Sequence, residues 1–449
     1  MSKEKQRLPT LDKPEKRLGI SDIVALIVGI VVGAGIFRTP SLVAANTSGD
    51  TAFYLTWLLG GVISLIGALS YAELTSAYPN TGGDYHFLYR AYGKRLAFLF
   101  AWARMSVIQT GSIALLAFIF GDYAVQIYPI GPHGEVIYAA AVIIILTAIN
   151  MAGLKMGSNT QKLFTVLEIL GIVIVIGAGL FFAPNATATI PATDAGTNYS
   201  FGMAMVFVLL TFGGWNEAAY ISAEIKSGPR SMVKAMVLSI IIITTIYLII
   251  NYTYIRVLGH SGVASSEAVA ADLMRIVWGE QAVKFIGILV AVSALTSANA
   301  TIITGARSNY ALGRDLPLLS SLGKWNKKNS SPINALLIQA IIAILLVCLG
   351  LFTRDGFEAI VDYTAPVFWF FFLLIGIAVI VLRVKDPHSP RPFKVPLYPV
   401  LPIIFCVSSA LLLYSSLTYT GKGALFGVGI ILLGLLLPLF SRRSLRQNS

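Results

Sequence analysis

The 449-residue chain is strongly apolar and basic, and this composition excludes a soluble domain. Hydrophobic residues make up 56% of it and charged residues only 12%, about half of the charged share of a soluble globular domain. The net charge of +12 does not indicate nucleic-acid binding, because the basic residues stand in short segments between apolar runs. Cys348 and Cys406 lie inside apolar runs, so we expect neither a disulfide framework nor a metal site, and no cofactor.

Apolar runs long enough to cross a hydrocarbon core of about 30 Å follow one another along the whole chain. They predict an all-α integral membrane protein, since only helices satisfy each backbone amide within its own segment. We count twelve spans, and those of the first half are 20–45, 53–78, 96–128, 136–153, 160–183 and 201–224. Those of the second half are 232–257, 280–312, 333–352, 358–383, 398–420 and 424–441.

The basic residues between the spans predict the orientation of the chain. Of 33 Lys and Arg residues, 26 fall in the tails 1–19 and 442–449 or in alternate loops, and four fall on the opposite side. Because basic loops remain in the cytoplasm, both tails are expected there. The polar stretches 184–200 and 257–279 then face outward. We therefore expect a multi-pass protein of the cell membrane, either an inner or a plasma membrane.

The first and sixth spans carry closely spaced glycines near their middle. Span 20–45 contains Gly33 and Gly35, and span 201–224 contains Gly213 and Gly214. Glycine costs a helix about 1 kcal/mol relative to alanine and lets its backbone unwind. The two spans occupy corresponding positions in two five-helix halves, spans 1–5 and spans 6–10. Interruptions in matching positions predict the binding site of a transporter.

Unwinding would give such a site two kinds of free backbone group. N–H groups at the start of a half-helix suit a carboxylate, and carbonyls at the end of a half-helix suit an ammonium group. A site that offers both is suited to a zwitterion. Gly29 and Gly33 also form a small-xxx-small pattern, which on its own indicates close helix packing. The second interruption, followed by Asn216 and Glu217, favours the binding site.

Short motifs follow one another in a specific order along nearly the whole chain. They are Gly33-Ala34-Gly35-Ile36-Phe37, Tyr71-Ala72-Glu73-Leu74, Gly82-Gly83-Asp84-Tyr85, Phe212-Gly213-Gly214-Trp215-Asn216, Ser297-Ala298-Asn299 and Arg391-Pro392-Phe393-Lys394-Val395-Pro396. This series resembles the amino acid–polyamine–organocation (APC) superfamily, particularly its L-amino-acid transporter branch. The resemblance implies a LeuT-like fold, in which two inverted five-helix repeats, 20–183 and 201–383, are followed by two extra helices in 398–441.

The resemblance also implies which residues would bind the substrate. The N–H groups of Ala34 and Gly35 would hold the carboxylate. The carbonyls of Val31 and Leu210 would hold the amine. The full set carried over by position is Val31, Gly33, Ala34, Gly35, Leu210, Phe212, Gly213, Gly214 and Asn216.

Charged residues inside spans are further candidates, because a charge there costs roughly 2.5–3.5 kcal/mol on insertion scales. Glu217 either binds a polar or cationic substrate side chain or pairs with Arg38 or Arg104. Arg104 is expected to partner a buried acid. Arg38 either lines an outer vestibule or extends to the outer interface. Glu73 is expected to pair with basic loop residues.

Glu168 departs from the family pattern, because many sodium-independent relatives carry lysine at the matching position on the fifth span. Thr296 and Ser297 lie in the region that forms a sodium site in sodium-coupled members. A carboxylate in a low-dielectric site should bind a cation or a proton. Glu168 is therefore predicted to couple transport to protons or, second, to sodium. Alternatively, it pairs with a basic group or is hydrogen-bonded to Thr296 or Ser297.

The function that fits best is a secondary active amino-acid transporter, either a symporter or an antiporter. A non-transporting amino-acid sensor is the alternative class, although tails of about 19 and 8 residues leave little room for a signalling domain. An enzyme is not expected, because no catalytic pair has usable spacing within the spans, and a channel-like polar lining is also absent. Animal relatives join a glycoprotein through an extracellular cysteine. No predicted extracellular loop contains one, so no covalently linked subunit is expected.

Overall fold

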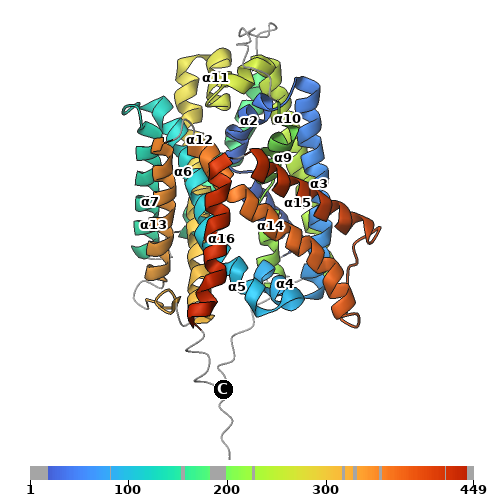
Figure 1. Ribbon diagram of the computed structural model, residues 1–449. Coiled ribbons are helices and arrows are strands. Elements are labelled where there is room, and N and C mark those ends of the chain that lie inside the picture. Colours follow the sequence, from blue (N-terminus) through green and yellow to red (C-terminus); the bar gives the residue numbers. More distant parts are fainter. Residues whose placement is uncertain are drawn as a thin grey trace, which may run out of the picture.

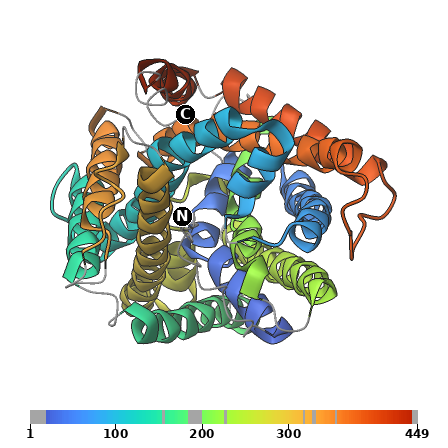
Figure 2. The same ribbon diagram turned by 90° about the horizontal axis from the view of Figure 1, so that it is seen from below.

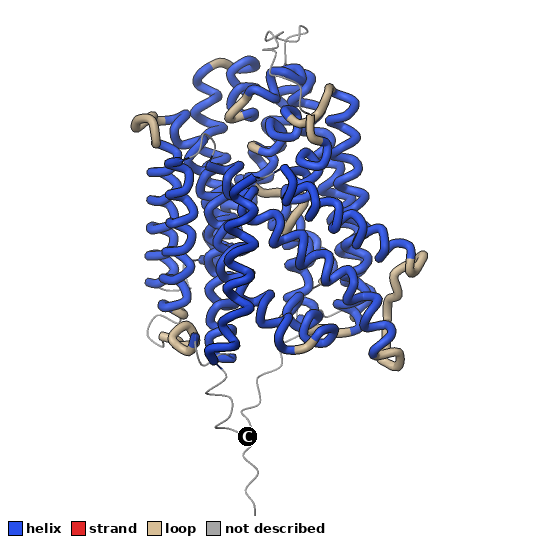
Figure 3. The backbone as a smooth tube through the Cα atoms, in the orientation of Figure 1, coloured by secondary structure: helices blue, strands red, loops and turns tan. Residues whose placement is uncertain are grey.

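The computed structural model describes residues 19–80, 82–152, 157–182, 199–224, 228–315, 319–326, 331–352, 356–419 and 421–441. In these residues the chain forms helices and one isolated bridge between Asn326 and Ser331 (Figures 1 and 3). The predicted all-helical architecture is therefore confirmed. Most of the tails and of the predicted outer loop 184–200 lies outside the described residues.

The helices follow one another in chain order. The first ten are α1 (Ile20–Val31), η1 (Ala34–Phe37), α2 (Thr39–Ala45), α3 (Asp50–Ala77), α4 (Gly83–Tyr92), α5 (Lys94–Ala103), η2 (Arg104–Ile108), α6 (Gln109–Ile127), α7 (Gly134–Ala152) and α8 (Gly157–Phe181). The next ten are α9 (Phe201–Thr211), η4 (Trp215–Glu224), α10 (Pro229–Ser265), α11 (Val269–Trp278), α12 (Glu280–Asp315), α13 (Ile333–Cys348), η6 (Leu349–Phe352), α14 (Gly356–Lys385), α15 (Val400–Tyr419) and α16 (Gly421–Ser441).

Nine helical segments of the described chain are long and apolar enough to cross a membrane. Two shorter apolar helices accompany them, Val166–Phe181 and Gly423–Leu435. The count of twelve spans remains a prediction. The stretch 257–279, which is expected to face outward, is largely helical. The helix α10 continues to Ser265 across a kink at Gly259, and α11 follows it.

The long helices pack side by side as a bundle (Figures 1 and 2). The helix α12 packs along α6, and α10 packs along both α1 and α3. The short helices α4 and α11 lie at opposite ends of the bundle (Figure 1). Large apolar side chains, such as those of Leu55, Ile145 and Leu345, are exposed. Exposed leucine and isoleucine on long apolar helices are what a hydrocarbon environment favours.

Two glycines of α3 let the centre of the bundle close around the interrupted helices. A Cβ atom on Gly60 would collide with Val208 of α9, and one on Gly61 would collide with Thr244 of α10. Their absence allows α3 to approach both helices closely. The nearby ring of Trp57 then meets the rings of Phe212 and Tyr247 at centroid distances of 6.4 and 5.6 Å. This aromatic cluster fixes the backbone beside the candidate site.

Candidate substrate and coupling site

The first interrupted helix ends at Val31 and resumes as η1 at Ala34, and we call residues 32–33 the first break. The Gly33 N–H turns back to the Val31 carbonyl at 2.8 Å. Among the described residues, the N–H groups of Ala34 and Gly35 donate to no backbone carbonyl. The start of η1 therefore offers two N–H groups to a ligand.

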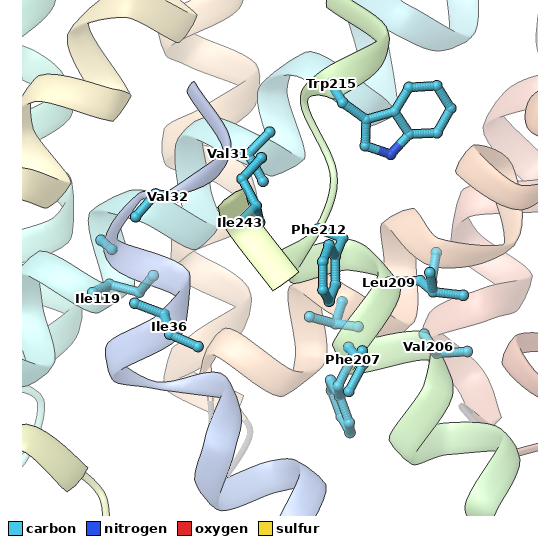
Figure 4. Packing of buried hydrophobic residues seen from close by; sticks show 14 of the residues in the cluster. Val31, Val32, Ile36, Ile119, Val206, Phe207, Leu209, Phe212, Trp215 and Ile243 are labelled. Carbon is cyan, nitrogen blue, oxygen red and sulfur yellow. The ribbon is translucent and has the colours of Figure 1, made fainter. Parts of the chain in front are cut away.

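The second interrupted helix ends at Thr211 and resumes as η4 at Trp215, and we call residues 212–214 the second break. Gly214 has a φ of 111°, a conformation that side-chain-bearing residues rarely adopt. A Cβ atom there would also lie 2.8 Å from Cγ2 of Ile30. Figure 4 shows that the backbone between Phe212 and Trp215 is not helical. Only glycine fits this position, because the backbone of the second break lies against α1.

The two breaks lie side by side, and one hydroxyl group joins them. The buried Tyr247 of α10 donates to the carbonyls of Val31 at 2.7 Å and Thr211 at 3.1 Å. These are the last residues of α1 and α9, whose carbonyls lack the next helical turn. Sequence reasoning missed Tyr247. A tyrosine in a span does need a polar partner, but the sequence does not reveal which one.

The carbonyls expected to bind an amine already accept protein donors. Val31 accepts bonds from Gly33 and Tyr247, and Leu210 accepts one from the Gly213 N–H at 2.9 Å. A substrate ammonium group must therefore share these carbonyls or displace a donor. The predicted pocket residue Phe212 is fully buried, with its ring 5.0 Å from that of Tyr247.

Glu168 of α8 lies beside the first break, between α8 and α12. Its Oε1 accepts a hydrogen bond from Ser293, and a Cβ atom on Gly33 would lie 3.8 Å from that Oε1 and 3.3 Å from the Ser297 hydroxyl. The glutamate is 2% exposed, and its Oε2 has no hydrogen-bond partner among the described residues. No basic side chain of the described chain pairs with it.

The two predicted hydroxyl groups of α12 differ in role. Ser297 faces Gly33, whereas the Thr296 hydroxyl bonds to the Val292 carbonyl of its own helix. The hydrogen bond to Glu168 comes from Ser293 instead. Ser293 and Ser297 are four residues apart, so they share one face of the helix. That spacing was a usable signal in the sequence for Ser293.

Glu217 of η4 forms an ion pair within the protein, as the second of its two predicted roles requires. Its partner is Arg104 and not Arg38. Its carboxylate oxygens lie 3.1 and 3.2 Å from Nη2 of Arg104, whose Nη1 donates to the Tyr220 hydroxyl at 2.8 Å. The acid expected for Arg104 is therefore Glu217. Asn216, the preceding residue, is buried. A further acid, Asp84 of α4, was not selected from the sequence as a site residue and is buried in the same cluster.

Two other charged residues have partners away from the breaks. Arg38 is buried and lies 3.5 Å from Asp122, so its charge has an acidic neighbour inside the bundle. Glu73 accepts bonds of 2.7 and 2.6 Å from Arg383 and lies 3.6 Å from Arg391. The predicted pairing of Glu73 with basic residues is therefore confirmed.

A helical membrane protein in which two interrupted helices meet has the arrangement that secondary transporters use for their substrate sites. A model of the amino acid permease family matches residues 18–437, nearly the whole chain. The chain belongs to this family, as the motif resemblance implied, and it is a multi-pass membrane protein rather than an enzyme.

Its relatives include named transporters and an exchanger. The b(0,+)-type amino acid transporter 1 of Mus musculus is 30% identical over 408 residues, which cover 89% of this chain and 82% of that protein. The large neutral amino acids transporter small subunit 2 of Mus musculus is 29% identical over 438 residues, covering 94% and 80%. The serine/threonine exchanger SteT of Bacillus subtilis (strain 168) is 25% identical over 406 residues, covering 90% and 91%.

Proposed function

We propose that this chain moves amino acids across the cytoplasmic membrane by alternating access and binds them where the two breaks meet. The observation that carries the proposal is the convergence of both breaks on one hydroxyl group, that of Tyr247. The free N–H groups of Ala34 and Gly35 are the carboxylate receptor, favoured by the N-terminal end of η1. The carbonyls of Val31 and Leu210 receive the amine. The names of the relatives support an amino-acid substrate.

The rest of the proposed site surrounds the substrate side chain. Its walls are Phe212, Gly213, Gly214 and Asn216, and Gly33 leaves room for the turn of the first break. Glu217 contributes a wall rather than a direct ligand, because its carboxylate is held by Arg104.

Uptake into proteoliposomes tests the proposal. Radiolabelled L-leucine, L-serine and L-threonine are the first probes, because the relatives' names include large neutral amino acids, serine and threonine. At least one should accumulate, and blocking its carboxylate as an amide or its amine as an N-acetyl group should prevent competition. Binding without uptake would identify a sensor instead, and competition by both blocked analogues would place the site elsewhere.

Coupling is the second part of the proposal, and it depends on Glu168. A buried carboxylate whose only hydrogen-bond partner among the described residues is a serine hydroxyl is strongly disfavoured when charged and isolated. It should therefore take up a proton or a cation beside Gly33, where its occupancy bears directly on the first break. A proton is preferred, because Glu168 and the hydroxyls of Ser293 and Ser297 offer few of the oxygen ligands that a metal ion takes. Sodium symport and exchange are the alternatives.

The coupling test compares wild type, Glu168→Gln and the control Glu280→Gln under an imposed pH gradient. Glu280 lies at the exposed start of α12, outside the site. Uptake by wild type and by the control should accelerate with the gradient, and uptake by Glu168→Gln should not. Acceleration by sodium alone would favour the sodium alternative, and stimulation only by internal amino acid would favour exchange. Equal responses of wild type and Glu168→Gln would reduce Glu168 to a structural residue.

The proposed fold has twelve spans, two inverted repeats and cytoplasmic tails. Reporter fusions at Ser2 and Ser449 should report the cytoplasm, and one near Asp194 should report the outside. A cytoplasmic signal at Asp194 contradicts this topology. Although one relative is named a small subunit, we propose no covalently linked partner, because Cys348 and Cys406 both lie on apolar helices.

A further inference from the structure

Arg104 stands at a backbone irregularity in the middle of a predicted span. It is the first residue of η2, a stretch of π-helix between α5 and α6. Such stretches are rare and are frequently found at functional sites. In this widened turn the Ser106 carbonyl accepts a hydrogen bond of 2.9 Å from the Tyr363 hydroxyl of α14. The Arg104 side chain is only 8% exposed, so its charge needs a partner inside the bundle.

Both partners of Arg104 belong to η4, directly after the second break. Glu217 accepts through both carboxylate oxygens, and Tyr220 accepts through its hydroxyl, with its ring 4.6 Å from the guanidinium. These contacts hold the segment that carries Asn216, a wall of the proposed pocket. This part of η4 is therefore held in place by a neighbouring helix and not by the substrate.

A second buried carboxylate, that of Asp84, lies in the same cluster. Asp84, on the first turn of α4, is 2% exposed, and its Oδ1 accepts no hydrogen bond of ordinary length among the described residues, although Asn216 and Tyr71 lie close to it. Nε of Arg104 also has no acceptor in the part of the chain that the structure describes. Burial raises the pKa of Asp84 to about 7 in spite of the nearby Arg104.

The helix α4 packs directly on η4, so movement of one changes the surroundings of the other. A Cβ atom on Gly83 would lie 2.7 Å from the Tyr220 ring, which places the α4 backbone against that residue. Arg104 therefore has two carboxylates within its cluster, one engaged and one not. If η4 moved away, Arg104 would be left without a counter-charge unless Asp84 replaced Glu217.

We propose that Arg104 is the positioning residue for η4: it holds this wall of the site through Glu217 and Tyr220, and it passes to Asp84 when η4 moves during transport. This inference rests on the proposed transport function. In this proposal, Glu217 is the partner of Arg104 in the state described here, and Asp84 is its partner after η4 has moved. The two carboxylates should therefore affect different kinetic constants.

The test measures KM and the maximum uptake rate for whichever of L-leucine, L-serine and L-threonine the wild type transports. Glu217→Gln should raise KM about tenfold, because a hydrogen bond to a charged group is lost from the pocket wall. Asp84→Asn should lower the maximum rate about tenfold and leave KM within about twofold. The double variant Arg104→Glu with Glu217→Arg reverses the ion pair. Its KM should return part of the way to the wild-type value. The control Arg275→Gln removes an exposed ion pair of α11 and should change neither constant.

The outcomes separate this inference from the proposed function. Uptake of no amino acid by the wild type overturns both. If the wild type does transport, two results overturn the inference. In one, Asp84→Asn changes neither KM nor the maximum rate. In the other, Glu217→Gln and Asp84→Asn have the same effect on KM and the same effect on the maximum rate. If Glu217→Gln does not fold, Tyr220→Phe replaces it. That variant removes one hydroxyl and should raise KM about threefold, and an unchanged KM overturns the inference.

Discussion

A glutamate stands beside each of the two breaks, but the two acids have different partners. Glu168, at the first break, accepts a hydrogen bond from a neutral serine and has no basic partner in the described chain. Glu217, after the second break, is paired with Arg104. Residue type therefore does not determine the role of an acid in a membrane interior, because its partner does. The first break suits an exchangeable proton or cation, and the second is held by a fixed charge pair.

Gly35, directly after the first break, and Gly214, in the second break, differ in the same way. A Cβ atom on Gly35 would lie 3.6 Å from Cγ2 of Thr211, an ordinary contact, whereas Gly214 has a positive φ and no room beside Ile30. The start of η1 thus has room for a methyl group at Gly35. The second break is packed tightly.

Alanine substitutions at these glycines should separate the breaks most strongly. Gly214→Ala combines an unfavourable backbone conformation of about 1–3 kcal/mol with overpacking of about 1–3 kcal/mol. We expect its uptake per folded protein to fall to background. Gly35→Ala should retain uptake within about threefold, because its added methyl group makes only ordinary contacts.

The matching variant Gly35→Leu supplies the control at the first break. Its larger side chain fills the space in front of the N–H groups, so uptake should be lost while folding, measured by size-exclusion chromatography, is retained. Normal uptake by Gly35→Leu would mean that no carboxylate approaches there. Equal behaviour of Gly214→Ala and Gly35→Ala would contradict the difference in packing.

The two glutamates should also differ in their effect on stability. Arg104→Gln leaves Glu217 without its counter-charge. Losing one partner of a buried pair costs about 3–5 kcal/mol, which we reduce to about 2 kcal/mol because Glu217 is 30% exposed and can be rehydrated. Glu168→Gln removes a carboxyl group that has no basic partner among the described residues, and it should leave stability unchanged or slightly raised. Thermal unfolding in detergent measures both, and a larger loss for Glu168→Gln would reverse the assignment.

The group shared by both breaks gives a smaller effect. Tyr247→Phe keeps the ring packed against Trp57 and Phe212 but removes the hydroxyl that joins Val31 to Thr211. Substrate affinity should change about tenfold, as expected for about 1.4 kcal/mol. Tyr254→Phe is the control, since this residue of the same helix is buried and its hydroxyl has no hydrogen-bond partner among the described residues. Similar effects of the two variants would show a general loss of packing.

The contrast between the breaks was only partly predictable from the sequence. Clustered glycines predict where helices are interrupted, because the conformational preference of glycine is a local property. The partner of Glu217 was left open between Arg38 and Arg104, since both lie far away in the chain. Thr296 and Ser297 are neighbours, and only the rotation of α12 decides which of them faces Gly33. Distant contacts of this kind depend on packing, which a single sequence does not display.

Asp84 also shows what sequence reasoning missed, and it offers a prediction that depends on pH. It lies on α4, between the spanning segments, and it is faced by Arg104, Glu217, Tyr71 and Tyr220. Burial raises its pKa from 3.8 to about 7, Arg104 lowers it, and Glu217 raises it further. The proton is therefore held more tightly in the folded protein than in the unfolded chain.

The stability of the wild type should fall as the pH rises toward 7. Below pH 3.8 both states carry the proton, and between pH 3.8 and about 7 only the folded state does, so this contribution to stability is progressively lost and is absent above pH 7. The expected slope is roughly 1 kcal/mol per pH unit. Asp84→Asn should lack this slope, and all other titratable groups are common to both proteins. Thermal unfolding at pH 5, 6, 7 and 8 measures the difference. Parallel curves of stability against pH for the two proteins would mean that Asp84 is already charged and paired with Arg104. Glu217 would then not be the only carboxylate paired with Arg104 in this state, and the contrast between Glu217 and Asp84 would be lost.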